Sequence, residues 1–447
     1  MLSVPKQELN GQFAMLPMDD VHFGSGSVQK LGAALEQYGV ERAVIITGNS
    51  LAQNTDLVAR VETAAGGRTA GMFSGTSQHV PRESVIAAAD FARSKNADAI
   101  ISFGGGTPND TAKAVTMCLA EGITEPGGLD AVRIKFEYPD KLEIPSLSTD
   151  PLPMFGIPTT LSGGEFTFFV GVTDRERKVK DLYLDKRITA KSVFLDPDLT
   201  LATPERLWLG TGIRAVDHCI EAMYSATRQP FTDALAYRAL NMLVRYLRET
   251  KADPSDLAAR GQCMVAAWMS VCGLGSVALG LSHGIGHQLG ARCNVPHGET
   301  SAVMLRNVMT FNRKDTLAQQ AWVAEAMGVD VSAMSEAEAA TTASDEVLKL
   351  VRDDLDLPWR LRDVGVNEVD FDGIASDALE DLVVASNPRK VESRDQVIER
   401  ISRQPAAIPA SGARTVSPMI EPRAERCGRK ASNRRTRTSN RRSRTGS

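Results

Sequence analysis

The sequence has few cysteines and places none of them close together. None of the six belongs to a Cys-x-x-Cys pair, and they stand at Cys118, Cys219, Cys263, Cys272, Cys293 and Cys427. This scatter is typical of reduced thiols in a cytoplasm and argues against a disulfide framework or a zinc knuckle. The first residues lack a basic region followed by an apolar core, so we expect no secretion signal and a cytoplasmic protein.

Formal charge is missing from one long stretch, because residues 261–291 contain no Asp, Glu, Lys or Arg. That length is sufficient for a transmembrane helix. The stretch is, however, rich in Gly, Ala and Ser and contains histidines near its end. We therefore predict the buried central helix of a helical domain, and no membrane association.

Charge is also unevenly distributed along the chain, whose formal net charge is -4. Residues 404–447 hold eleven Lys and Arg against two Asp and Glu, which leaves -13 for residues 1–403. Apolar periodicity stops in this basic tail, so we predict that it is disordered. The acidic body gives no reason to expect nucleic-acid binding there.

Apolar runs at residues 42–50, 69–75 and 99–103 alternate with segments of helical periodicity. Such alternation is typical of a parallel α/β sheet. We expect the last strand within residues 192–200 and a helix start after it, with Thr203 as N-cap and Pro204 in the first turn. Strand signals are then absent. The sequence thus predicts an α/β domain over residues 1–200, an all-α domain over 201–403 and a tail over 404–447.

Two glycine- and hydroxyl-rich turns follow predicted strands. The first, GGGTPNDTAK at residues 104–113, opens a helix; bare glycines and free helix N–H groups suit a pyrophosphate. It matches neither G-x-G-x-x-G nor G-x-x-x-x-G-K-[ST], so a plain strand-to-helix turn remains an alternative. The second turn, IPTTLSGGE at residues 157–165, offers hydroxyls for ribose or phosphate oxygens, or for capping the turn itself. Together the turns suit a dinucleotide at the strand ends of an open sheet.

Histidines are concentrated in two short stretches, although the chain has only six. His283 and His287 are four residues apart and share a helix face, while Asn294 and Pro296 predict a break before His297. His218 lies upstream in another helical run. Each could be an ordinary core or surface histidine, but their concentration favours an active site.

These motifs together resemble the iron-containing (group III) alcohol dehydrogenases over roughly residues 18 to 400. The resemblance implies a Rossmann-like parallel-sheet domain followed by an all-α domain, NADH or NADPH as cofactor, and a homodimer. By the same resemblance, metal-ligand positions are occupied by His218, His283 and His297, and His287 is expected near the substrate. Cofactor contacts are expected from Gly48, Asn49, Gly104, Gly105, Gly106, Thr107, Asp110, Thr159, Thr160, Ser162, Thr167 and Lys180. Gly48 stands where many members carry an aspartate that repels a 2′-phosphate, which favours acceptance of NADPH.

One position departs from the family pattern. The family's metal site needs an aspartate four residues before the first histidine, and this chain has Arg214 there. A guanidinium cannot ligate iron or zinc and repels a divalent cation. Loss of this ligand, the short PTTLSGGE turn and NVPHGET resemble the maleylacetate reductases, a branch of the same superfamily. We expect no metal ion and a small anionic substrate that Arg214 binds. The expected reaction is the reduction of maleylacetate to 3-oxoadipate in aromatic-compound degradation, with His287 or His283 as the proton donor.

Three alternatives stay open from the sequence. Arg214 could instead form a salt bridge to Asp217 or Glu221 on its own helix. The protein could be an alcohol dehydrogenase for a small alcohol or aldehyde, with iron or zinc in a modified site at His218, His283 and His297. It could also be a non-catalytic protein that binds an acidic partner through its basic tail; truncation at Arg403 would distinguish this, because an enzyme would keep its turnover.

Overall fold

The computed structural model describes residues 5, 12–137 and 141–402. The basic tail, for which we predicted disorder, lies outside these residues, as does Cys427. The five other cysteines are free thiols. No helix in the described part of the chain is long and apolar enough to cross a membrane.

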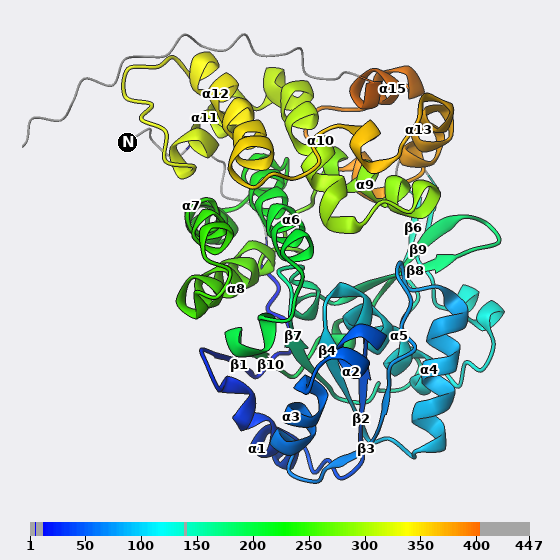
Figure 1. The fold of residues 1–447 in the computed structure, drawn as a ribbon. Coiled ribbons are helices and arrows are strands. Elements are labelled where there is room, and N and C mark those ends of the chain that lie inside the picture. The colour runs from blue at the N-terminus through cyan, green and yellow to red at the C-terminus, as the bar shows by residue number, and fades with distance from the viewer. Residues whose placement is uncertain (1–4, 6–11, 138–140, 403–447) are drawn as a thin grey trace, which may run out of the picture. The chain divides into compact units, whose positions relative to one another are not determined.

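A six-stranded parallel sheet forms the centre of the N-terminal half (Figure 1), with strand order β1-β10-β7-β4-β2-β3. Its strands are β1 (Asp20–Phe23), β2 (Ala43–Thr47), β3 (Thr69–Phe73), β4 (Ala99–Gly104), β7 (Met154–Pro158) and β10 (Ser192–Leu195). β2, β4, β7 and β10 are buried along their whole length, as parallel strands covered on both faces are. The predicted α/β sheet is confirmed.

Helices cover the two faces of this sheet with separate apolar cores. Alternate residues of β2 point to opposite sides, so Ile45 packs with α1 (Leu31–Gln37) and α3 (Leu57–Ala64). Ile46 belongs to the other core, with α4 (Arg82–Ser94) and α5 (Gly106–Ala120). The carboxyl ends of β2, β4, β7 and β10 meet at one edge, so the loops that follow them come together there.

The C-terminal half is helical, as predicted, and among the described residues no named strand follows β10. Its helices are α6 (Glu205–Tyr224), α7 (Pro230–Ala252), α8 (Leu257–Val271), α9 (Leu281–Cys293), α10 (His297–Asn312), α11 (Leu317–Ala326), α12 (Glu336–Lys349), α13 (Phe371–Leu379), α14 (Leu382–Ala385) and α15 (Arg394–Ser402). α6 packs against α7, α8 and α10. The backbones of α6 and α10 approach so closely that a Cβ on Gly298 would lie 2.6 Å from the carbonyl carbon of Gly210.

Several details differ from the sequence prediction. The uncharged stretch 261–291 belongs to two helices, α8 and α9, with a break between them, so a single central helix was wrong. Thr203 is not the N-cap of α6, which is Pro204; its hydroxyl donates to the Thr159 carbonyl at 2.7 Å instead. That bond ties the start of the helical half to the turn after β7.

Two antiparallel hairpins were not predicted. β5 (Lys135–Glu137) pairs with β6 (Lys141–Glu143), and β8 (Phe169–Asp174) pairs with β9 (Val179–Leu184). α2 (Asn49–Asn54), also unpredicted, follows β2 directly. Lys180 therefore lies within a strand, β9. The contacts of α9 with β9 bring this hairpin to the histidine-rich helix.

Candidate active site

The histidine-rich segment folds as predicted into a helix, a break and a second helix. α9 ends at Cys293, Asn294 adopts a left-handed conformation (φ 56°), and α10 begins at His297 after Pro296. The rings of His287 and His297 come to lie nearly parallel, 5.9 Å apart between centroids. His218, from α6, stacks on His283 at 4.9 Å. All four predicted histidines therefore lie in two stacked pairs.

Glu221 fixes the position of His283. Its carboxylate accepts from His283 Nδ1 at 2.7 Å and from the backbone N–H groups of Gly280 and Ser282 at 2.9 and 3.0 Å. These donors lie at the start of α9, where backbone N–H groups lack partners within the helix. Glu221 thus caps α9 and orients the imidazole in one arrangement.

Arg214 reaches the same region from α6 and is buried, with 5% of its surface exposed. Its Nη1 donates to Ser301 Oγ at 3.2 Å, and the Ser301 hydroxyl donates to Asp217 Oδ2 at 2.6 Å. No Asp or Glu in the described part of the chain brings an oxygen within 4.0 Å of an Arg214 nitrogen. The salt bridge to Asp217 or Glu221 considered from the sequence is therefore not formed. The Ser301 hydroxyl links the guanidinium to the carboxyl group of Asp217.

Burial and charge set the protonation of this cluster. Burial lowers the pKa of Arg214 to about 10, which leaves it charged at neutral pH. Burial, together with the neighbouring Glu221, raises the pKa of Asp217 to about 8. The pKa values of His218, His283 and His297 lie well below the usual value, first because the rings are buried and further because of the Arg214 charge. The three histidines are therefore neutral at neutral pH.

Asp381, which the sequence did not indicate as a site residue, holds His287. His287 Nδ1 lies 2.8 Å from Asp381 Oδ2, which also accepts from the Gln288 side chain at 3.2 Å. Asp381 precedes α14, and its other oxygen accepts from the Val383 N–H as an N-cap. The only signal in the sequence was an aspartate before a short apolar run. His287 keeps 14% of its side chain exposed, against 3% for His283.

The two predicted cofactor turns lie side by side at the carboxyl edge of the sheet. α5 begins at Gly106 without a side-chain cap, and Gly106 and Thr107 contribute the first N–H groups of the helix, which have no partner within it. A Cβ on Gly105 would lie 3.0 Å from Thr160, and one on Gly106 would lie 3.5 Å from Ser162. The approach is tight at Gly105, where a side chain would crowd Thr160, and is an ordinary van der Waals distance at Gly106. The cradle fits a pyrophosphate at a helix N-terminus.

The side chain of Thr167 forms its hydrogen bonds within the protein. Its hydroxyl accepts from Lys113 Nζ at 2.8 Å and donates to the Gly164 carbonyl at 2.8 Å. Lys113, absent from the sequence prediction, is fully buried and also donates to the carbonyls of Gly164 and Phe169. This lysine links α5 to the segment after β7 and so supports the cradle from behind.

Lys180 lies near both the cofactor turns and the histidines. Its side chain passes over Gly171, where a Cβ would come within 2.1 Å of Lys180 Cε. The charge of Lys180 opposes the burial that raises the pKa of Asp110, and it further lowers the pKa of His297. The charge of Arg214 in turn lowers the pKa of Lys180, after burial itself. The charges of Lys180 and Arg214 thus act on each other and on His297.

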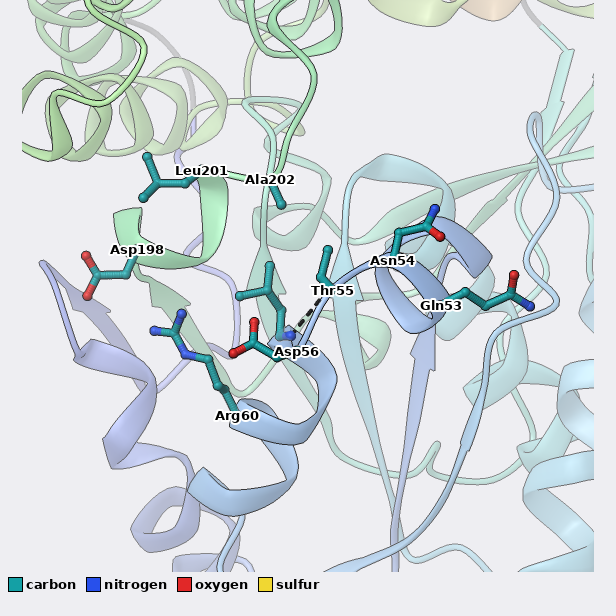
Figure 2. A pocket seen from close by; sticks show the side chains of 9 residues that line it. Gln53, Asn54, Thr55, Asp56, Arg60, Asp198, Leu201 and Ala202 are labelled. Atoms are coloured by element: carbon teal, nitrogen blue, oxygen red, sulfur yellow. Dashed lines mark hydrogen bonds between the residues drawn. The ribbon is translucent and has the colours of Figure 1, made fainter.

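A pocket of about 580 Å³ opens farther along the sheet edge (Figure 2). It lies between the α2–α3 connection and the turn after β10, with Arg60 and Asp198 on facing sides. Gly48 and Asn49 begin α2, so the pocket is at the other end of that helix. Its lining residues are Gln53, Asn54, Thr55, Asp56, Leu57, Arg60, Asp198, Leu201 and Ala202.

Comparison with known proteins decides the family. Residues 19–197 match the family model described as iron-containing alcohol dehydrogenase, and residues 209–404 match its C-terminal counterpart. This chain belongs to the iron-containing alcohol dehydrogenase family. It is an oxidoreductase of that family, with the dinucleotide-binding type of sheet before its helical half.

Several relatives that carry the names of different enzymes have about the same sequence identity to this chain. The NAD-dependent methanol dehydrogenase of Bacillus methanolicus is 32% identical over 377 residues, which are 83% of this chain and 94% of the relative. The maleylacetate reductase of Pseudomonas sp. strain P51 is 28% identical over 375 residues, which are 83% and 92%. Among solved structures, the alcohol dehydrogenase from Oenococcus oeni has a TM-score of 0.80 at 25% identity and covers 88% of this chain and 99% of its own.

Proposed function

We propose that this protein is an NAD(P)H-dependent reductase of an unsaturated oxo-dicarboxylate, with maleylacetate as the substrate that fits best, and that it works without a metal ion. The observation that carries the proposal is Arg214: a buried, charged guanidinium with no carboxylate within 4.0 Å among the described residues. A buried charge without a direct partner is costly. A substrate carboxylate would supply that partner.

The same residues fit a divalent cation poorly. Asp217, Glu221 and His283 bring ligand atoms within 4.8 Å of one another. However, both Glu221 oxygens already accept N–H groups, and Asp217 Oδ2 accepts two hydroxyls. The Arg214 charge that disfavours a proton on His218, His283 and His297 also disfavours a metal ion among them.

The chemistry then follows from the charges of the site. Bound NAD(P)H would supply a hydride to one carbon of the substrate double bond that is conjugated with the ketone. Arg214 holds a substrate carboxylate and stabilises the negative charge that develops on the enolate. His287, supported at Nδ1 by Asp381, delivers the proton to the other carbon. One C=C bond is reduced, one NAD(P)H is oxidised, and the product is the saturated oxo-diacid.

Two features support the cofactor part of this proposal. The Gly104–Gly106 cradle receives the pyrophosphate, and the pocket of Figure 2 lies along the same sheet edge, where the adenosine end would extend. Gly48 has no carboxylate to repel a 2′-phosphate, so we expect NADPH to be accepted as well as NADH.

The test is the oxidation of NADH and NADPH against maleylacetate, short aldehydes and simple ketones, with a chelator and with added iron or zinc. We expect turnover of maleylacetate that the chelator leaves unchanged. Reduction of aldehydes that requires added metal, with no reduction of the oxo-diacid, would instead identify a metal-dependent alcohol dehydrogenase. One observation favours that second candidate: Asp217 Oδ1, His218 Nδ1 and His283 Nε2 are buried and have no hydrogen-bond partner in the structure.

Ser301 provides a sharper test of how Arg214 is held. Ser301→Ala removes the hydroxyl that links the guanidinium to Asp217, so we expect the KM for the oxo-diacid to rise about tenfold. Ser282→Ala is the matched control, because Ser282 Oγ donates to the same Asp217 oxygen at 2.7 Å and forms no hydrogen bond with Arg214. Steady-state kinetics give the KM for the oxo-diacid in both variants. An equal rise in KM in Ser301→Ala and Ser282→Ala would mean that Ser301 acts only through Asp217.

A further inference from the structure

Two consecutive residues between β3 and α4 adopt a left-handed backbone conformation. His79 has φ 63° and Val80 has φ 55°. Such angles are uncommon for any residue with a side chain and are outliers for a β-branched one, and each carries a cost in conformational free energy. A conformation of this kind persists only where the surrounding structure holds it.

Strand β8 holds this backbone. Thr173 donates from its hydroxyl to the His79 carbonyl at 2.7 Å and from its N–H to the Val80 carbonyl at 2.9 Å. The Val80 N–H donates to the Ser77 carbonyl at 3.0 Å, and the Val80 side chain is buried in the core. The loop is thereby fixed so that Val80 points inward and His79 is presented on the other side.

His79 is presented to the catalytic face of α9. A Cβ on Gly290 would lie 3.4 Å from His79 Cε1, and a Cβ on Gly286 would lie 3.5 Å from Arg214 Nη1. Gly286 and Gly290 are four residues apart, so they stand on one face with a rise of about 6 Å between them. His287 lies on the same side of this helix. His79 and Arg214 are therefore separated along α9 by a span comparable to an extended six-carbon chain.

His79 also has unused hydrogen-bonding capacity. Its Nε2 is buried and without a partner in the structure. Burial lowers the pKa of His79 and the charge of Lys180 lowers it further, while hydrogen bonding with Asn294 acts in the opposite direction. Lys180 pairs with Thr173 in the β8–β9 hairpin, and the Thr173 hydroxyl donates to the His79 carbonyl, so Lys180 lies beside the loop that carries His79. A neutral imidazole beside an ammonium group can donate a hydrogen bond to an anion that the lysine attracts.

We propose that His79 contacts the substrate and, with Lys180, binds the second carboxylate of the dianion whose other end Arg214 holds. This assignment rests on the proposed function, because it needs a substrate with two carboxylates. It gives the strained loop a function, because the loop holds the His79 ring against α9 at Gly290. Selectivity for diacids over monoacids would then come from groups on two different parts of the chain.

The experiment compares His79→Asn with the parent. Asparagine tolerates the left-handed backbone but is too short to reach the same point. We expect the KM for maleylacetate to rise about tenfold, as for one lost hydrogen bond to a charged group, while the KM for NADH stays unchanged. Two substrate analogues, each lacking a different one of the two carboxylates, are compared. For the analogue that lacks the carboxylate assigned to His79, the substitution should leave the KM unchanged. Gln78→Ala, at the exposed neighbouring residue, is the control.

A second variant and a binding measurement keep the test decisive. Gly290→Ala places a methyl group against the His79 ring and should raise the same KM without altering the backbone of residue 79. Calorimetric titration of adipate into the parent–NADH complex and into the His79→Asn complex measures diacid binding without turnover. An unchanged KM and unchanged adipate affinity in His79→Asn, or an equal rise in the KM for NADH, would overturn the assignment. Loss of adipate affinity in His79→Asn, with a parent that does not reduce maleylacetate, would support the assignment and reject the proposed reaction.

Discussion

Replacing Arg214 with methionine is expected to lower kcat/KM for maleylacetate about 1000-fold, as for truncation of one partner of a buried charge pair. Methionine fills a similar apolar space, but the substrate carboxylate and the developing enolate then lose their cation. Asp217 can take up a proton, because burial already raises its pKa to about 8, so the variant is expected to fold. Steady-state kinetics with saturating NADH provide the measurement.

Two further variants control this experiment. Arg206→Met makes the same change two turns earlier on α6, at an exposed arginine that pairs with Glu299, and should alter kcat/KM less than about threefold. Arg214→Asp restores a carboxylate where the family's metal ligand stands and should bind one equivalent of zinc or iron, which the parent should not. An Arg214→Met enzyme that reduces maleylacetate as well as the parent would exclude the proposed role of the guanidinium.

Replacing His287 with glutamine is expected to lower kcat about 1000-fold, within the range of a lost general acid. The KM for NADH should stay close to the parent value, because His287 lies among the histidines of the helical half. Asp381→Asn keeps the shape of the partner but removes its charge, and should lower kcat by about 10- to 100-fold. The measurement is the kcat of each variant from saturation curves.

The matched control for this pair is Gln288→Ala. Gln288 donates to the same Asp381 oxygen as His287 and lies next to it on α9. If Gln288→Ala lowers kcat as much as Asp381→Asn does, Asp381 is a structural residue and does not act through the imidazole. A nearly unchanged kcat in His287→Gln would indicate that His283, and not His287, donates the proton.

The sheet and the helix α9 were predictable because their signals are local. Buried parallel strands such as β2 and β4 appear as continuous apolar runs, and the four-residue offset of His283 and His287 places them on one helix face. The strands β1 and β9 were not predicted. β1 lies at the edge of the sheet with a partly exposed, mixed sequence, and β9 is identified only by its pairing with β8.

The partners of the site residues could not be predicted, because they are distant in sequence. Asp381 follows His287 by 94 residues, and Ser301 follows Arg214 by 87. The sequence offered only Asp217 or Glu221, on the same helix, as an alternative direct partner of Arg214. His79 likewise gave no signal, because its position depends on a backbone conformation that β8 imposes from elsewhere in the chain.

The most direct test of the central claim is a crystal structure of the protein with NADH and a non-reacting six-carbon diacid, collected with anomalous data at a metal edge. The account predicts a carboxylate oxygen within hydrogen-bond distance of the Arg214 guanidinium and no anomalous peak between the histidines. A divalent ion coordinated by His218, His283 and His297, with the guanidinium turned away, would contradict it.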